Sequence, residues 1–363
     1  MMTISYIGKE RITPTVLSTI DLLRFPLIFG VLLLHTFVIG ENVGGHVQYP
    51  QGTFLILESV EYFIKRGFGD LCVPTFFVIS GYLFFRKGFI DKSDYLKKMK
   101  SRIHSLLLPY LFWNTIFILF VGAVELMIPA FVGERKNIWD FTFFEWCNAY
   151  WDLSQGLIPL WYIRDLMIIN IFTPVIYFFI KKMGYLILMI FLILWLLNLF
   201  VYVNGIGLRS VMFYTIGAYL AIVQPRIPVL NIKIRLILLI FYLVLLAISA
   251  YLYFKGDNTV FINQISILYG VILLLILFVD IQSKHHFKTP SFLLRNCFFI
   301  YVFHMFVIYI PDKLLLYVLP KNSFCGILLF LLVPIITSII CICIYELIRR
   351  LSPPLSKFMV GGR

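Results

Sequence analysis

The stretch RFPLIFGVLLLHTF, from Arg24 to Phe37, carries only two ionisable side chains, Arg24 and His35. It lies inside a longer apolar run, residues 16–39. The hydrocarbon core of a bilayer requires about 20 residues of helix, and this run is long enough. It is longer than the core of a signal peptide and lacks a small-residue cleavage site. We therefore expect residues 16–39 to remain in the protein as a membrane-spanning helix.

The composition extends this expectation to the whole chain. Of its 363 residues, 61% are hydrophobic and only 13% are charged, and the mean hydropathy is +0.94. A soluble protein of this size covers its surface with charged side chains, so that class is excluded. The sequence predicts an all-α, polytopic membrane protein in one membrane-embedded domain, 1–363, with no separate soluble domain. Ten spans are expected, at residues 16–39, 70–85, 103–127, 157–180, 184–203, 208–224, 234–254, 260–281, 295–311 and 324–348.

The basic residues predict the orientation of these spans. Cytoplasmic loops collect Lys and Arg, and seven such residues lie within 86–102 alone. With both termini in the cytoplasm, every cytoplasmic segment carries at least two of them. This bias, together with contacts to anionic lipids, accounts for the net charge of +13, so no nucleic-acid partner is predicted. The six cysteines show neither CxxC nor Cys/His ligand spacing, and we expect no metal site and no disulfide framework.

Arg24 and His35 are placed to share one side of the first helix. Eleven steps of about 100° return to nearly the same face, roughly 16 Å further along. An Arg inside a span costs about 3 kcal/mol unless it is paired or faces a wet cavity, which makes it a functional candidate. A neutral His can accept a proton from a hydroxyl group. The alternative is structural: Asp21 pairs with Arg24 for helix packing, and His35 bonds between helices.

Five stretches in order resemble the acyltransferase-3 family of membrane O-acyltransferases. Arg24, ten residues and His35 resemble that family's first-helix pair. The other four stretches are PTFFVISGYLFF from Pro74 to Phe85, RIHSLLLPYLFW from Arg102 to Trp113, LWYIRDL from Leu160 to Leu166, and FIYVFHMFVI from Phe299 to Ile308. Together they extend over most of the chain. The chain departs from the family pattern in its Lys-rich basic cluster and in the Arg164–Asp165 pair.

The resemblance implies an enzyme of the cell membrane that moves an acyl group, usually acetyl from acetyl-CoA, to a hydroxyl of a sugar or lipid-linked glycan. It makes His35 the candidate general base and Arg24 the partner of the acyl donor or of the developing negative charge. The cations of residues 86–102 suit the phosphates of coenzyme A. The candidates for donor binding are Arg86, Lys98, Lys100 and Arg102. The alternative is that these cations only set the topology.

Four further residues are candidates for substrate binding. His304 lies inside the ninth predicted span, where it either positions the substrate or only bonds between helices. Arg164 and Asp165, with the neighbouring Trp161, either line the acceptor cavity or form a buried pair for packing. Ser80 and Gly81 are expected to be packing residues. No GxSxG elbow is present, which favours direct transfer without a covalent enzyme intermediate.

Three competing functions remain at this point. A transporter or flippase for a glycan, lipid or organic acid would also carry charges inside its spans. Such proteins often contain inverted repeats, and no repeat is evident in this sequence. An acyltransferase of another membrane family would also use a histidine inside a helix. A membrane scaffold without catalysis would tolerate the loss of Arg24, His35 and Arg102 together.

Overall fold

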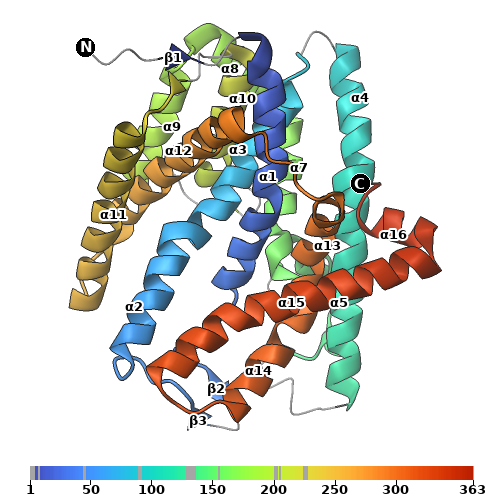
Figure 1. The fold of residues 1–363 in the computed structure, drawn as a ribbon. Helices are drawn as coiled ribbons and strands as arrows, with labels where there is room; N and C mark the ends of the chain where they lie inside the picture. The colour runs from blue at the N-terminus through green and yellow to red at the C-terminus, as the bar shows by residue number, and fades with distance from the viewer. Residues whose placement is uncertain are drawn as a thin grey trace.

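The computed structural model describes residues 5–6, 9–43, 46–88, 92–127, 136–153, 156–199, 203, 206–223 and 228–362. Nearly all of this part of the chain is helical, so the predicted all-α fold is confirmed (Figure 1). Two short antiparallel ladders join loops: β1 (Ser5–Tyr6) with β4 (Pro228–Val229), and β2 (Asn42–Val43) with β3 (His46–Val47).

Six helical segments of the described residues are long and apolar enough to span a membrane. Four of them are single helices, and two are helices interrupted by a π-helical turn. They are α1 (Lys9–Leu34), α2–η1–α3 (Leu55–Ile64, Lys65–Gly69, Asp70–Phe85), α4–η2–α5 (Lys92–Arg102, Ile103–Leu107, Leu108–Met127), α11 (Ile232–Lys255), α12 (Val260–His285) and α15 (Ser323–Leu351).

Two helix pairs pass the same test but bend between their halves. The pair α7 (Trp161–Ile171) and α8 (Thr173–Met183) bends by 64°, and the pair α13 (Ser291–Val307) and α14 (Tyr309–Val318) bends by 51°. Two shorter apolar helices are α9 (Leu186–Leu196) and α10 (Leu208–Val223). Every one of the ten predicted spans therefore contains an apolar helix. Two short helices outside these spans are α6 (Phe143–Trp151) and α16 (Pro353–Met359).

Several predicted boundaries are wrong. The second span begins at Leu55 rather than at residue 70, because α2 continues through η1 into α3. The third begins at Lys92, since the basic helix α4 runs on into α5. The first helix ends at Leu34, one residue before His35, and α9 ends at Leu196. Residues 200–202 of the fifth predicted span lie outside the described residues.

Some of the predicted cytoplasmic and outer segments lie at opposite ends of the structure. The start of α4, the helix α8 and the strand β1 lie at the upper end of Figure 1, whereas β2, β3 and α14 lie at the lower end. The start of α4, which carries part of the basic segment 86–102, thus shares one end of the molecule with β1. The C-terminal helix α16 lies at mid-height beside α5, where the Trp113 Nε1 donates to the Met359 carbonyl at 2.9 Å. The cytoplasmic location of the C-terminus stays a prediction.

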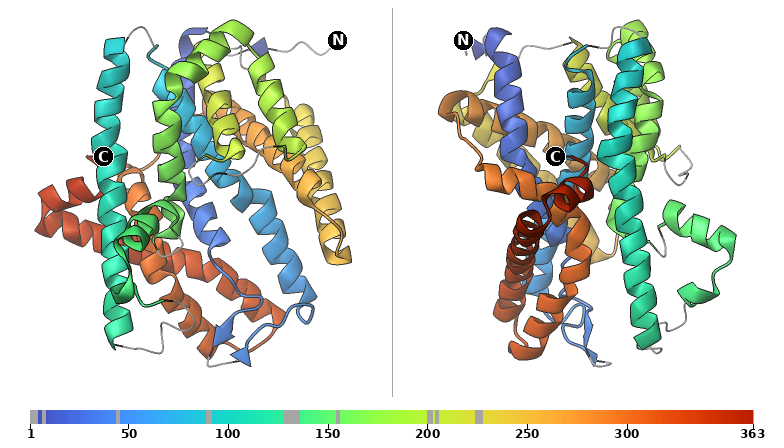
Figure 2. Two further views of the ribbon diagram at one scale, coloured as in Figure 1. Left: turned by 180° about the vertical axis from the view of Figure 1, so that it is seen from behind. Right: turned by 90° about the vertical axis from the view of Figure 1, so that its right-hand side faces the viewer.

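Helices α1, α3 and α10 form the centre of the fold, and α6 lies outside α5 (Figure 2). The contact between α3 and α10 depends on two glycines. A Cβ atom on Gly81 would lie 2.1 Å from the Tyr214 carbonyl oxygen, and one on Gly217 would lie 1.9 Å from the Val78 carbonyl oxygen. Both contacts involve backbone atoms, which no side-chain rotation relieves. The packing role predicted for Gly81 is confirmed.

This contact yields a stability prediction. Gly81→Ala should force α3 and α10 apart and lower the free energy of unfolding by about 1–3 kcal/mol, the usual effect of overpacking a core. Ala247→Val, at an exposed position of α11, adds more volume and serves as the control. Thermal unfolding of the purified protein in detergent measures both. Equal melting temperatures for the two variants would contradict the close contact.

Candidate active site

The contact between α1 and α13 brings His35 and His304 together. Their ring centroids lie 5.2 Å apart, with the ring planes inclined by 46°. Three turns towards the N-terminus of α1, Arg24 lies close enough to Cys297 of α13 to act on it electrostatically. Since Cys297 and His304 are two turns apart on one face of α13, the two helices run side by side in the same direction. The sequence offered both histidines as candidates but gave no sign that they touch.

Two glycines let α1 approach the helix that carries the neighbouring charges. A Cβ atom on Gly30 would lie 2.3 Å from the Cys72 sulfur, and one on Gly69 would lie 2.6 Å from the Leu34 side chain. The backbone N–H of His35 donates to the Leu32 carbonyl at 3.1 Å, so His35 continues the last turn of α1. The position of His35 is therefore set by helix packing and not by a free loop.

The hydrogen bonds of His304 define which ring nitrogen is available. Its Nδ1 lies 2.8 Å from the Tyr301 carbonyl oxygen and 3.2 Å from that of Ile300. A carbonyl oxygen only accepts hydrogen bonds, so Nδ1 must carry a proton. The side chain is fully buried, and its Nε2 has no hydrogen-bond partner within the described part of the chain. Such an orphaned buried nitrogen is costly unless a ligand or a proton transfer uses it.

His35 is partly exposed beside a charged pair of the π-helical turn η1. Lys65 is close enough to act electrostatically on His35 and lies 4.2 Å from the centroid of the Phe37 ring. Its Nζ donates to Glu61 at 2.6 Å. Glu61 in turn accepts from the Ile39 backbone N–H at 3.4 Å. The pair Glu61–Lys65 was missed by sequence reasoning, because residues 41–69 were assigned to an outer segment and not to a span.

Two cavities flank this region of the fold. A polar cavity of about 470 Å³ is lined by residues on either side of His35, namely Leu34, Phe37 and Ile39, and by the charged face of α2 and η1. A second, apolar groove of about 420 Å³ contains Arg102 and Arg164. Arg24 lines neither of them. Neither of these two cavities therefore joins Arg24 to His35.

Arg24 forms the predicted pair with Asp21. Its Nη1 lies 3.3 Å from the Asp21 carboxylate, and the two side chains are 40% and 45% exposed. A half-exposed guanidinium within a span requires water or a ligand beside it. The structure therefore contains the structural pair that was the alternative, and it also leaves part of Arg24 open to a ligand.

The four predicted donor-binding cations differ in their surroundings. Lys98 donates to the carbonyls of Phe84 at 2.9 Å and Gly88 at 2.7 Å, which satisfies the C-terminal end of α3. Arg102 lies 5.8 Å from the centroid of the Phe84 ring. Arg86 is partly exposed at the end of α3 and Lys100 is exposed on α4. All four cations come from α4 or from the end of α3, at one end of the molecule.

The pair Arg164–Asp165 is buried, with 3% and 1% of the side chains exposed. Arg164 Nη2 lies 3.2 Å from Asp165, and its Nη1 donates to the Trp151 carbonyl at 2.5 Å. Asp165 also accepts from the Ser210 hydroxyl at 2.9 Å. The pair thus connects α7 with α10 and with the end of α6. The neighbouring Trp161 packs on Phe77, with ring centroids 6.2 Å apart.

No group of three or more His, Cys, Asp or Glu side chains that could hold a metal ion occurs among the described residues.

The family profile described as an acyltransferase domain matches residues 17–346. The chain belongs to the acyltransferase-3 family. Membership of this family and the apolar helices of the described residues fit a multi-pass protein of the cell membrane, as the sequence predicts.

One curated relative adds detail. The chain is 27% identical, over 247 residues, to the succinoglycan biosynthesis protein ExoH of Rhizobium meliloti (strain 1021). The match covers 66% of this chain and 64% of the relative, so it spans less than two thirds of the relative's length. No solved structure matches the chain.

The buried ion pair yields a second prediction. Asp165→Ala leaves the Arg164 charge buried without its carboxylate, and the free energy of unfolding should fall by about 3–5 kcal/mol. The double variant Arg164→Met/Asp165→Leu removes both charges, and its free energy of unfolding should fall by less. Lys136→Met removes one charge of the exposed pair with Glu145, and this should change the free energy of unfolding little. A folded Asp165→Ala protein of normal stability would argue instead for the role in acceptor binding.

Proposed function

We propose that the protein transfers an acyl group from acyl-CoA to a hydroxyl of a cell-surface or lipid-linked carbohydrate. The observation that carries this proposal is the contact between His35 and His304, in which the second imidazole is held by its Nδ1 and keeps its Nε2 without a partner. Membership of the acyltransferase family supports the reaction class. The relative is named as a succinoglycan biosynthesis protein, and this supports a carbohydrate acceptor.

The proposed reaction is a direct transfer. His35, the partly exposed member of the pair, takes the proton of the acceptor hydroxyl as the oxygen attacks the thioester carbonyl. The C–S bond then breaks, and the imidazolium returns its proton to the leaving sulfur of coenzyme A. His304 is the buried member of the pair, and its ring packs against His35 and fixes the position of the His35 ring. The products are the O-acyl ester and free CoA.

The donor enters from the end of the molecule that carries the basic helix α4. Arg24 is half exposed within the first span, and its charge suits the acyl donor. Arg102 and Lys100 are placed to meet the phosphates of coenzyme A, and Arg86 lies near them at the end of α3. Lys98 has two of its donors on backbone carbonyls, so its contribution is the smallest of the four. Acetyl is the acyl group that the family resemblance favours.

The proposal is tested by replacing the base. His35→Ala should lower acyl transfer by at least about 100-fold, which is the lower range for loss of a general base. The protein should still fold, because the backbone N–H of His35, which closes the last turn of α1, is kept in the alanine variant. His46→Ala, at an exposed histidine of β3, is the matched control. Mass spectrometry of surface glycans, from cells expressing each variant, measures the acyl-sized mass difference.

Two results would contradict the proposal. If glycans from cells with the His35→Ala protein carry the same acyl groups as those with the wild-type protein, His35 is not the base. If no acyl-sized difference separates cells with and without the intact gene, and CoA does not stabilise the purified protein against heat, a transporter becomes the better explanation.

A further inference from the structure

The polar cavity beside His35 has features of a built binding site that the proposed reaction has not yet used. Its volume, about 470 Å³, lies in the range of small-molecule sites in proteins. Its walls come from four separate parts of the chain: the end of α1, the loop before α2, the α2–η1 segment and the end of α11. The lining residues that the argument needs are Gln51, Glu58, Glu61, Tyr62, Lys65 and Tyr253.

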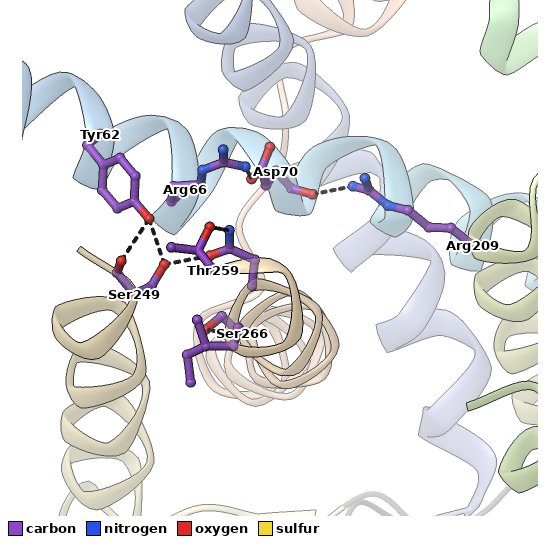
Figure 3. Close-up of polar contacts among 9 residues, drawn as sticks. Tyr62, Arg66, Asp70, Arg209, Ser249, Thr259 and Ser266 are labelled. Carbon is purple, nitrogen blue, oxygen red and sulfur yellow. Dashed lines mark hydrogen bonds and ion pairs between the residues drawn. The ribbon is translucent and has the colours of Figure 1, made fainter. Parts of the chain in front are cut away.

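The charges in the cavity are already paired, with one exception. Lys65 pairs with Glu61 at 2.6 Å, and Arg66 pairs with Asp70 at 2.8 Å. The Asp70 carbonyl also accepts from Arg209 at 3.0 Å (Figure 3). The remaining carboxylate, Glu58, is 6% exposed, and among the described residues it accepts the Gly52 backbone N–H at 3.1 Å and forms no ion pair. The cavity therefore has a small excess of negative charge, which disfavours acidic sugars and phosphorylated ligands.

Two stacked tyrosines form the wall of the cavity that faces α11. The Tyr62 and Tyr253 rings have centroids 4.5 Å apart and planes inclined by 28°. The Tyr62 hydroxyl is fixed by Ser249, at 2.7 Å from its hydroxyl and 3.1 Å from its carbonyl oxygen (Figure 3). Tyr253 remains 36% exposed. An aromatic face beside carboxylate and amide groups suits a sugar, which has apolar C–H faces and a ring of hydroxyl groups.

The cavity is adjacent to the proposed base. Leu34 and Phe37 line it on either side of His35, and Lys65 connects its charged wall with that histidine. Lys65 and Arg66 lie in the π-helical turn η1, and such turns often occur at functional sites. His35 itself does not line the cavity, but it borders the cavity through Leu34, Phe37 and Lys65.

We infer that this cavity is the acceptor site and that it holds a neutral sugar unit of the glycan. The inference rests on the proposed function for the reaction, but the binding itself is tested separately. It also places the acceptor away from Arg164, Asp165 and Trp161, which the sequence offered either as lining of the acceptor cavity or as a packing cluster.

The test uses the purified full-length protein and a set of disaccharides, some neutral and some containing a uronic acid. Saturation-transfer NMR reports which of them bind. The wild-type protein should bind neutral members in preference to acidic ones, and Tyr253→Ala should weaken this binding about tenfold. Tyr251→Ala, two residues earlier on α11 and 66% exposed outside the cavity, is the matched control and should bind like the wild type.

Three outcomes would overturn the inference: no binding of neutral disaccharides, a preference for acidic ones, or binding that Tyr253→Ala leaves unchanged. The reaction is assessed independently by acyl transfer to surface glycans. If acyl transfer depends on His35 but the affinity for neutral sugars is the same in the wild type and in Tyr253→Ala, the proposed function stands and the proposed acceptor site is wrong. If Tyr253 governs sugar binding but the wild-type protein transfers no acyl group, the site stands and the function is wrong.

Discussion

The contact between α1 and α13 is the constraint on which the site depends. It sets two imidazoles 5.2 Å apart inside a membrane protein and buries one of them completely. Burying a polar ring without a partner for Nε2 destabilises the fold, and a ligand or a proton transfer at that nitrogen would offset this cost. Close glycine contacts hold the framework in place. Gly30 and Gly69 set α1 against the π-helical turn η1, and Gly81 and Gly217 set α3 against α10.

The polar groups of the fold are divided between two ends. The basic helix α4 and the end of α3 lie at one end, and the polar cavity with paired charges lies beside His35 at the end of α1. A membrane enzyme that takes its donor from one side and its acceptor from the other needs this division. In the proposed function, Arg24 of α1 and His35, which directly follows α1, belong to the two halves of such a site. The helix between them is apolar, which keeps bulk water from joining the two sides.

The sequence predicted the helices better than the site. All ten apolar runs contain a helix, because length and hydropathy alone decide whether a segment can cross a bilayer. The segment before residue 70 was misassigned, since Glu58, Glu61, Lys65 and Arg66 made it look like a loop although they face a cavity. The pairing of Arg24 with Asp21 was predictable because both lie within one helical turn.

Contacts between distant elements could not be read from the sequence. His35 and His304 were both named as candidates, but their contact depends on how α13 packs against α1, which periodicity does not encode. Arg164 and Asp165 were expected at the acceptor site or in a packing pair, and their bonds to Trp151 and Ser210 become visible only in three dimensions. Tyr253 carried no motif, since its role follows from its stacking on Tyr62.

A double-mutant cycle on the two histidines tests the central claim most directly. Acyl transfer is measured for the wild type, His35→Ala, His304→Asn and the double variant; Asn keeps a donor for the Tyr301 carbonyl and lacks the second ring nitrogen. If the two imidazoles act as one unit, the double variant should be no slower than His35→Ala alone. If the fold loss of acyl transfer in the double variant equals the product of the losses in the two single variants, the two residues act independently. This result would contradict the account of the site as a histidine pair.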